Sequence, residues 1–459
     1  MKIQSPPGMR DFYPAEMRVQ NWLFDAWRRV SRAFGFQEYE GPIFEFLELY
    51  TLKSGEGIVG DLFTFQDRGD RRFAIRAEMT PTLARMVAAR ANALPRPIKW
   101  FSVPRMCRAE RPQRGRLREF YQWNVDTLGV DDVLADAEVI AVVVAFFRAI
   151  GLTPADVVIR FSSRPLVGAI LSAIGVAPEL HDAAIRVIDR MEKLKPQEFE
   201  ESWQSACGGA VSADAFRALL GELTFERLAA GERLAPAGTS APDASRSPVG
   251  SSAGGARSAA VRLALPDDVL TPLRALRDHL TAFGAADWCA FDLRVVRGLA
   301  YYTGIVFEAY ARDVQVGALA GGGRYDNLVG LLDGPPIGGV GFGMGDARIV
   351  EVLSELGRMP RLEESLDVFV IDADPALFSK ALEIVGTLRR AGLAVEFSFK
   401  RQPVGKQFKQ ASARGARFAV IVGTELTDRG EVALKDMQTQ TQRTLGADAL
   451  AAELSAGRR

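Results

Sequence analysis

The chain has 459 residues, of which 48% are hydrophobic, and its 57 lysines and arginines balance 57 aspartates and glutamates. This length accommodates two to four domains with buried cores, and the composition excludes a disordered or collagen-like chain. A net charge of zero argues against a uniformly basic nucleic-acid-binding protein, but it does not exclude local basic regions.

Metal and membrane functions find no support in the residue pattern. The three cysteines are isolated, which excludes a disulfide framework and a Cys-x-x-Cys site, and we expect no protein-held metal. His181 and His279 both lie on amphipathic helical patterns and are interpreted as surface or boundary residues. The longest apolar run, 139–147, is far shorter than the ~20 residues of a membrane span, and residues 1–10 lack a signal-peptide core. We therefore expect a soluble, cytoplasmic protein.

Helices and strands interleave along the first 162 residues. The predicted elements are a helix from Pro14 to Phe34, a hairpin within 61–77, a helix with Thr80 as N-cap and Pro81 at its first position, strands over 98–108 and 116–128, and a helix over 134–150. Because this order is not strictly βαβ, we expect an α+β fold with an antiparallel core.

The remainder of the chain contains three regions of different composition. Helical patterns occupy 163–286, interrupted by an Ala, Ser, Gly and Pro-rich run at 235–259 that we predict to be a flexible loop. Residues 291–346 show strand patterns and glycine clusters, and we predict that another helix begins at 346. From about residue 367, β-branched strands alternate with helices, which predicts a small α/β domain.

The segment 116–126 carries polar residues with a period of two. In a strand, Arg116, Arg118, Phe120, Gln122, Asn124 and Asp126 would share one face, and Leu117, Tyr121, Trp123 and Val125 the other. Such a polar row either lines a ligand cavity or forms the solvent-exposed face of an antiparallel sheet, and the pattern alone leaves both readings open.

The preceding loop, 108–116, is basic. Its arginines are suited to bidentate binding of phosphate or nucleic acid, although a solvated charged turn is the commoner outcome for an isolated charge run. Glycine clusters occur at 55–60, 320–326 and 338–345. The first matches a dinucleotide fingerprint by letters, but a predicted hairpin follows it, so we reject that reading, and no Walker A sequence occurs. The other two permit close approach of a ligand or a neighbouring strand.

Taken together, these segments resemble the histidyl-tRNA synthetase family of class II aminoacyl-tRNA synthetases. Residues 108–111 with strand 120–126 look like motif 2, residues 341–348 like motif 3, and residues 36–42 like motif 1. The stretches 297–304 and 322–326 resemble the two histidine-binding motifs of the family, and residues 7–14 resemble its N-terminus. Residues 404–409 and 416–422 are similar to its anticodon-binding domain.

The resemblance implies a class II antiparallel-sheet core with a helical insertion and a C-terminal α/β domain. The implied parts are the catalytic core in two pieces, 1–162 and 287–360, the insertion 163–286 with the loop 235–259, and the anticodon-binding domain 361–459. The implied activity is histidine–tRNA ligase: ATP activates histidine to the adenylate, which is transferred to the 3′ end of tRNA(His). Mg²⁺ would accompany ATP without a dedicated protein cage.

The resemblance also implies residue roles. The catalytic arginines would be Arg108 on the α-phosphate, Arg348 on the γ-phosphate and Arg297 opposite Arg108. The other implied contacts are Glu110 and Phe120 at the adenine, Glu78, Thr80, Gln122 and Asp126 at the substrate ammonium, and Tyr302 and Tyr325 at the imidazole. Ala300 and Asp346 stand where the family commonly has Asp and Glu, and Trp123 and Asn124 where small residues are frequent.

Charge patterning supports two RNA contacts. Residues 389–417 hold eight Lys and Arg against Glu396 alone, and residues 101–120 hold six Arg against two Glu. Phe397, Phe399 and Phe408 lie among the C-terminal cations and either stack on anticodon bases or belong to the core. By resemblance, Arg111, Gln113 and Arg114 would meet the acceptor end of tRNA, and Lys406 and Lys409 its anticodon end.

Two alternatives of other classes remain open. One is a synthetase-like regulatory subunit of ATP phosphoribosyltransferase, which binds histidine but typically lacks the C-terminal domain. The other is an adenylate-forming enzyme that does not serve tRNA. The resemblance further implies a homodimer with motif 1 at the interface, for which the aromatic density of residues 34–46 is a loose indication.

Overall fold

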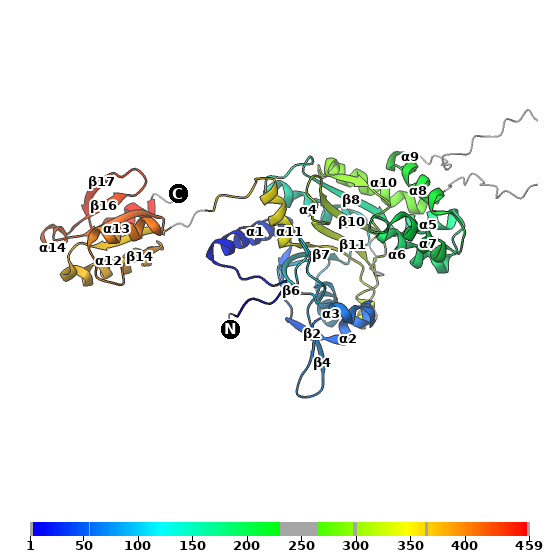
Figure 1. Ribbon diagram of the computed structural model, residues 1–459, viewed down its shortest axis with the longest axis horizontal. Coiled ribbons are helices and arrows are strands. Elements are labelled where there is room, and N and C mark those ends of the chain that lie inside the picture. The colour runs from blue at the N-terminus through cyan, green and yellow to red at the C-terminus, as the bar shows by residue number, and fades with distance from the viewer. Residues whose placement is uncertain (1–2, 55, 230–264, 297–300, 363–365, 457–459) are drawn as a thin grey trace, which may run out of the picture. The chain divides into compact units, whose positions relative to one another are not determined.

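The computed structural model of the chain describes residues 3–54, 56–229, 265–296, 301–362 and 366–456. The chain divides into two compact units, Met1–Met359 and Pro360–Arg459, each considered by itself (Figure 1). The predicted loop 235–259 and the predicted catalytic residue Arg297 lie outside the described residues, as does Ala300.

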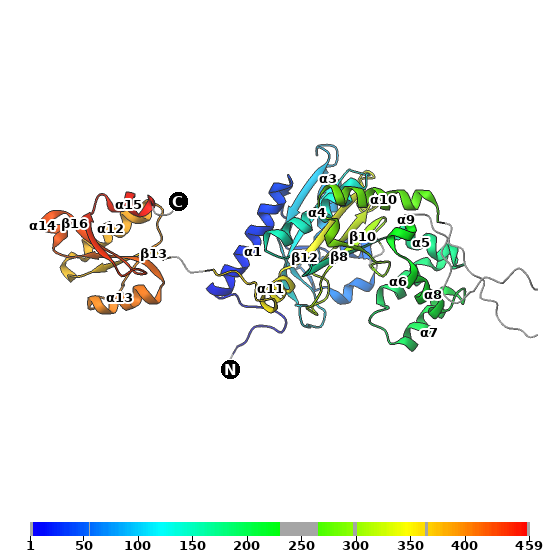
Figure 2. The same cartoon turned by 90° about the horizontal axis from the view of Figure 1, so that it is seen from above.

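A large, mainly antiparallel sheet forms the centre of the first unit (Figure 2). Its order is β1-β5-β7-β12-β11-β10-β8-β9, with β6 paired to β7, and β1–β5 and β8–β9 are parallel pairs. The bounds are β1 Gln37–Glu38, β5 Ile98–Ser102, β6 Arg105–Cys107, β7 Glu119–Leu128, β8 Val157–Ser163, β9 Cys289–Phe291, β10 Ile305–Ala311, β11 Ala320–Tyr325 and β12 Gly339–Gly345. This arrangement confirms the predicted α+β fold with an antiparallel core.

Two predicted strands have different bounds in the structure. The strand expected over 98–108 is divided into β5 and β6, with Pro104, which has no N–H to donate, between them. The strand expected from 116 begins only at Glu119, because Gly115 turns the chain at φ +67° and Arg116 forms a bridge with Gln113. Arg116 and Arg118 therefore belong to the loop and not to the strand.

Helices α1 (Pro14–Ala33), α4 (Leu134–Ala149) and α10 (Asp267–Ala282) pack with the central sheet, and α4 contacts both α1 and α10. The long apolar run 139–147 lies in α4 and is mostly buried, which makes it a core helix. Trp27 of α1 stacks on Trp123 of β7 with ring centroids 6.0 Å apart, and Phe146 of α4 lies 5.4 Å from Trp123. Large aromatic side chains thus fasten the helices to the sheet.

A small sheet in the order β2-β4-β3 lies beside this core. The elements here are β2 Phe44–Phe46, α2 Leu47–Ser54, the 3₁₀ helix η1 Glu56–Asp61, β3 Thr64–Gln66, β4 Arg72–Ile75 and α3 Thr80–Arg90. The predicted hairpin is confirmed, with Asp67 accepting the N–H groups of Gly69 and Arg71 in its turn. The predicted N-cap is wrong by one residue, because α3 already includes Thr80 and the cap position is Met79, whose side chain is buried by packing.

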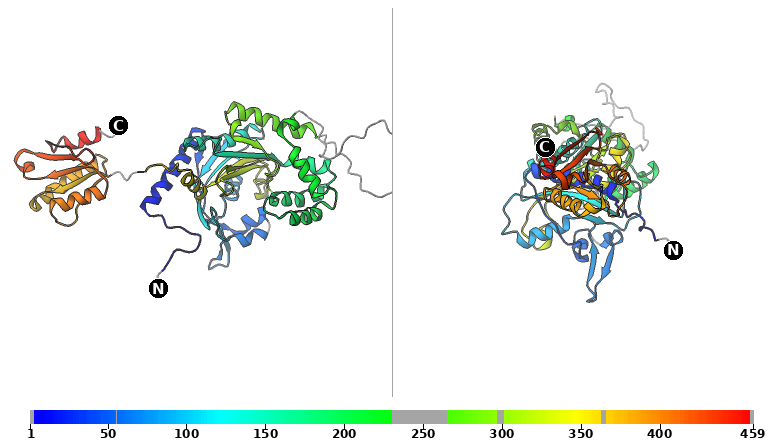
Figure 3. Two further views of the ribbon diagram at one scale, coloured as in Figure 1. Left: turned by 45° about the horizontal axis from the view of Figure 1, so that its top comes forward. Right: turned by 90° about the vertical axis from the view of Figure 1, so that its left-hand side faces the viewer.

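Within 164–229 and 265–288, the structure consists mainly of helices, as the pattern predicted. Figures 1 and 3 show α5–α9 gathered at one end of the first unit. The bounds are α5 Arg164–Ala173, η2 Pro178–Leu180, α6 His181–Arg190, α7 Pro196–Cys207, α8 Ala213–Glu222 and α9 Phe225–Ala229, followed by α10 and η3 Ala286–Trp288. His181 and His279 are both half-buried, which confirms their interpretation as boundary residues.

The first unit ends with η4 Gly330–Leu332 and α11 Asp346–Glu355, which begins at the predicted residue.

The second unit contains a sheet in the order β14-β13-β15-β16-β17. Its elements are β13 Leu366–Asp372, η5 Pro375–Leu377, α12 Phe378–Arg390, β14 Val395–Phe397, α13 Val404–Ala413, β15 Ala416–Val422, α14 Glu425–Arg429, β16 Glu431–Asp436, β17 Gln442–Gly446 and α15 Leu450–Ala456. The first three strands are parallel and alternate with helices as predicted, but the antiparallel hairpin β16–β17 was not anticipated. None of the helices in the described ranges is long and apolar enough to cross a membrane.

Candidate active site

A cavity of about 1020 Å³ lies against the central sheet of the first unit. Strands β7, β8, β10, β11 and β12 contribute to its lining, together with the first turn of α11 and residues at the start of α3. The predicted site residues that line it are Glu78, Thr80, Arg108, Gln113, Arg114, Phe120, Gln122, Asp126, Tyr302, Tyr325 and Arg348. Glu110 and Arg111 are described but do not line it, and Lys406 and Lys409 belong to the second unit.

The alternation predicted for β7 is present within the strand. Phe120, Gln122, Asn124 and Asp126 all line the cavity, whereas Trp123 on the opposite face is fully buried in the core. Asn124 is 5% exposed and Asp126 3%, so this polar row does not form the open face of a sheet. The structure therefore supports the interpretation that this polar row lines a ligand cavity.

Glycines of β12 create the space for these polar side chains. Gly341 pairs with Asp126, and a Cβ at Gly341 would lie 2.0 Å from the Asp126 Oδ1 atom. Gly343 pairs with Asn124, and a Cβ there would lie 2.9 Å from the Gln122 amide. Any larger residue at these two positions would displace the β7 side chains, so the glycine run 338–345 is required by the neighbouring strand.

Three arginines place positive charge at one end of the cavity. Arg108 lies with its guanidinium carbon 5.0 Å from the Phe120 ring centroid, and its Nε donates to the Ala77 carbonyl at 3.1 Å. Arg348 donates from Nε to the Gly115 carbonyl at 2.9 Å and from Nη1 to the Ala318 carbonyl. Burial, with repulsion from Arg116 and Arg108, lowers the pKa of Arg348. Arg108 and Arg348, which repel each other and are both held by backbone carbonyls, form a site suited to a polyanion such as a triphosphate.

Ion pairs hold the basic loop 108–116 in place. Arg116 donates from Nε to the Glu110 carboxylate at 2.9 Å, and Arg114 pairs with Glu351 and Glu355 of α11. Glu110 therefore faces Arg116 in this structure and not the cavity. Arg114 is held by α11, so an anionic ligand would have to compete with two carboxylates for its guanidinium.

The opposite end of the cavity combines buried tyrosines with a carboxylate. The Tyr325 hydroxyl donates to Asp126 Oδ1 at 2.5 Å, and both side chains are almost fully buried. Burial and the Asp126 charge raise the pKa of Tyr325, so its phenol remains protonated and a hydrogen-bond donor. Tyr302 is 6% exposed and lines the same cavity. This end can bind a cationic amine beside a planar polar ring.

Sequence reasoning missed two features of the first unit. Tyr301 also lines the cavity, with its ring centroid 4.5 Å from that of Tyr302 and its hydroxyl 3.3 Å from the Tyr302 hydroxyl. Asp346, at the start of α11, is fully buried, accepts the Tyr121 N–H at 3.1 Å and pairs with Arg10 at 2.6 Å. The adjacent tyrosines were a visible signal, whereas no local pattern links Arg10 to Asp346.

Among the residues that the structure describes, no group of three or more His, Cys, Asp or Glu side chains is placed to hold a metal ion. Cys107, Cys207 and Cys289 are free thiols. Burial raises the pKa of Cys207 to about 11 and that of Cys289 to about 12, which makes both poor nucleophiles at neutral pH.

Comparisons with known proteins agree with this geometry. The family model described as histidyl-tRNA synthetase matches residues 8–349, and the model described as anticodon binding domain matches residues 367–456. The histidine–tRNA ligase of Opitutus terrae is 40% identical over 441 residues, covering 96% of this chain and 95% of that protein. The chloroplastic/mitochondrial histidine–tRNA ligase of Arabidopsis thaliana is 37% identical over 440 residues, covering 96% and 84%.

Solved structures show the same fold. The crystal structure of histidyl-tRNA synthetase from Nostoc sp. PCC 7120 superposes with a TM-score of 0.77 at 24% identity, covering 100% of both chains. The class II fold expected from the motifs is thereby confirmed over both units. Because the family model spans most of the chain and relatives of high coverage exceed 30% identity, this chain belongs to the histidyl-tRNA synthetase family.

Proposed function

We propose that the protein is a histidine–tRNA ligase that activates histidine with ATP and transfers it to the 3′ end of tRNA(His). The observation that carries this proposal is that one cavity is lined both by Arg108 and Arg348 and by the hydrogen-bonded Asp126–Tyr325 pair. A triphosphate and an α-amino acid with a polar ring are complementary to these two sets of side chains.

In the activation step, the histidine carboxylate attacks the α-phosphorus, the new C–O–P bond forms, and pyrophosphate leaves. Asp126 and Glu78 would attract the substrate ammonium, with Thr80 and Gln122 beside them, because all four line the cavity. Tyr302 and Tyr325 would contact the imidazole. The adenylate is then consumed when a terminal ribose hydroxyl of tRNA attacks the carbonyl and AMP leaves.

The arginines would stabilise the charge that develops on the phosphates. Arg108 is assigned to the α-phosphate and Arg348 to the γ-phosphate, and Phe120 to stacking on adenine. Arg297, which lies outside the described residues, keeps its role opposite Arg108 on the family resemblance alone. Mg²⁺ is expected to arrive bound to the ATP phosphates. Glu110 requires release from Arg116 before it can approach adenine.

Two surfaces are assigned to tRNA. Lys406 and Lys409 are exposed on α13 of the second unit, and Phe399 is 89% exposed just before it. Phe408 instead is half-buried and packs against the core of this unit. In the first unit, Gln113 and Arg114 line the cavity mouth and, with Arg111, would meet the acceptor end. A cytoplasmic location is part of the same proposal.

A homodimer is proposed from an exposed apolar surface on the small sheet β2-β4-β3. Ile43, Phe44 and Phe46 are 58%, 43% and 51% exposed, and Phe65 lies 5.2 Å from Phe44. A second copy that covers these aromatic side chains would remove them from water. Sedimentation at micromolar concentration should show a dimer, and Phe46→Glu should give a monomer with an unchanged far-UV spectrum. A wild-type monomer would contradict the assignment.

The deciding experiment is ATP–pyrophosphate exchange with each of the twenty amino acids, followed by charging of tRNA. Exchange with histidine and charging of tRNA(His) are expected. Exchange without charging would favour an adenylate-forming enzyme that does not serve tRNA, and histidine binding without exchange would favour a regulatory subunit.

A further inference from the structure

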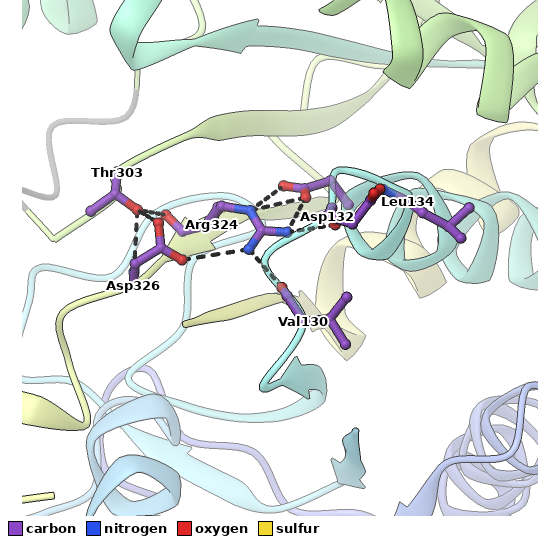
Figure 4. Close-up of polar contacts among 7 residues, drawn as sticks. Val130, Asp132, Leu134, Thr303, Arg324 and Asp326 are labelled. Carbon is purple, nitrogen blue, oxygen red and sulfur yellow. Dashed lines mark hydrogen bonds and ion pairs between the residues drawn. The ribbon is translucent and has the colours of Figure 1, made fainter. Parts of the chain in front are cut away.

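A buried ionic cluster surrounds Arg324 of β11 (Figure 4). The guanidinium of Arg324 donates from Nε to both carboxylate oxygens of Asp136, at 3.0 and 3.3 Å. Its Nη1 donates to the Val130 carbonyl at 2.9 Å and its Nη2 to the Asp132 carbonyl at 3.1 Å. The Arg324 side chain is 9% exposed and that of Asp136 is fully buried.

This cluster and the cavity occupy opposite faces of the same strand. Arg324 and Tyr325 are consecutive in β11, so their side chains point to opposite sides, and only Tyr325 lines the cavity. Burying a guanidinium is costly unless all its donors are satisfied, and here each of its nitrogens has an acceptor. Arg324, which holds β11 on the face away from the cavity, is thus adjacent in sequence to Tyr325, which lines the cavity.

Asp326 and Thr303 extend the cluster to the second tyrosine. Asp326 Oδ1 lies 3.5 Å from Arg324 Nη1, and its Oδ2 accepts the Thr303 hydroxyl at 2.5 Å. The Thr303 N–H donates to the Arg324 carbonyl at 2.8 Å, and the Asp326 N–H donates to Thr303 Oγ1 at 3.2 Å. The Thr303 hydroxyl also lies 3.4 Å from the Arg324 carbonyl, so four hydrogen bonds hold the segment beginning at Tyr302 to the end of β11.

Glycines permit this fastening. A Cβ at Gly304 would lie 3.0 Å from Cδ of Arg324, so the arginine stem occupies the space that a side chain there would need. A Cβ at Gly323 would lie 2.9 Å from Cδ1 of Tyr302, so the tyrosine ring rests directly on the strand. The relative positions of Tyr302 and Tyr325 consequently depend on the contacts between Thr303, Arg324 and Asp326.

We propose that Thr303, Asp326 and Arg324 are positioning residues that set the affinity of the cavity for histidine by fixing Tyr302 and Tyr325 relative to each other. The inference rests on the proposed function, which assigns these two tyrosines to the imidazole. None of the three positioning residues lines the cavity, so each acts through a tyrosine adjacent to it in sequence. Misplacement of a recognition group by a fraction of an ångström weakens substrate binding without removing the catalytic arginines.

The test compares Thr303→Val, which keeps the side-chain shape but removes the hydroxyl, with Thr303→Ser, which keeps the hydroxyl. Both are made in the full-length protein, and KM for histidine and for ATP is measured by pyrophosphate exchange. Thr303→Val should raise KM for histidine about tenfold, with KM for ATP within about twofold of wild type. Thr303→Ser should keep the wild-type KM for histidine, because it keeps the hydroxyl. Direct histidine binding by calorimetry should show the same order.

Thermal melting separates positioning from folding. If Thr303→Val lowers the melting temperature but leaves KM for histidine unchanged, or if both KM values rise together, the positioning role is overturned. If wild-type protein neither binds histidine nor supports exchange, the proposed function fails and this inference fails with it. If the wild-type protein binds histidine and Thr303→Val binds it with the same affinity, this inference alone is overturned.

Discussion

The two units carry positive charge in contrasting ways. In the first unit, Arg108 and Arg348 come from distant segments, are held by backbone carbonyls and line one cavity. In the second, eight Lys and Arg lie within residues 389–417, and all are exposed. Some of these have partners, such as Arg414 with Glu396 and Arg401 with Asp372. Preorganised charge suits a developing transition state, whereas exposed charge suits a flexible polyanion.

The contrast predicts that single substitutions have large effects in the cavity and small ones on the basic surface. The largest effect is expected for Arg108→Ala, which should reduce pyrophosphate exchange about 10³-fold because it removes a preorganised donor from the phosphate clamp. Arg108→Lys should recover only part of the rate, since one ammonium cannot reproduce the guanidinium fork. Exchange within tenfold of wild type would remove Arg108 from the clamp.

Asp126→Asn should raise KM for histidine about a hundredfold, because it removes the charge assigned to the substrate ammonium. The substitution is isosteric, so it does not press on Gly341 and an amide oxygen remains to accept from Tyr325. KM for ATP, measured in the same exchange assay, serves as the internal control and should not change. A parallel rise of both KM values would indicate a general disturbance of the cavity.

Arg10→Ala tests whether cations of the first unit also support the fold. It leaves the fully buried Asp346 without its cation, so we expect a loss of about 2 kcal/mol in unfolding free energy. Burial raises the pKa of Asp346, and removing Arg10 should raise it further. A carboxyl with a raised folded-state pKa destabilises the fold as pH rises through the interval between its unfolded and folded values.

The deficit of Arg10→Ala should therefore be larger at pH 7 than at pH 4.5, as measured by urea denaturation at each pH. The exposed Arg29 on α1 offers a matched control, and Arg29→Ala should change stability by less than about 0.5 kcal/mol. An equal deficit at both pH values would contradict the assignment to Asp346.

On the basic surface, Phe399→Ala should raise KM for tRNA about tenfold in the charging assay, by removing one stacking platform. Pyrophosphate exchange and the melting temperature should not change, because the ring is 89% exposed. Loss of stability in this variant would show that Phe399 belongs to the core of the second unit.

The smallest effect is expected for the double variant Lys406→Ala, Lys409→Ala. KM for tRNA should rise about fivefold, and the slope of log affinity against log salt should fall by about 1.4, the value for two contacts to single-stranded RNA. Exchange should remain at the wild-type rate. An unchanged salt slope would place the RNA elsewhere on the unit.

Much of this organisation could be read from local patterns. The period of two in 120–126 identified the cavity-facing residues of β7, since neighbouring side chains in a strand must alternate faces. The start of α11, the hairpin 61–77 and the helices α5–α10 likewise follow from residues close in sequence. By contrast, capping at Thr80 was predicted one residue off, since α3 begins at Thr80 and its cap position is the buried Met79.

Local patterns in the chain specify which strand faces carry polar groups, and the order of the motifs identifies the family. Which of those groups meet depends on how the strands assemble. Arg10 and Asp346 are 336 positions apart, and Arg324 and Asp136 are 188 apart, so no periodic signal can pair them. These pairings depend on sheet order and on the space left by Gly304 and Gly341, which exist only once the strands are assembled.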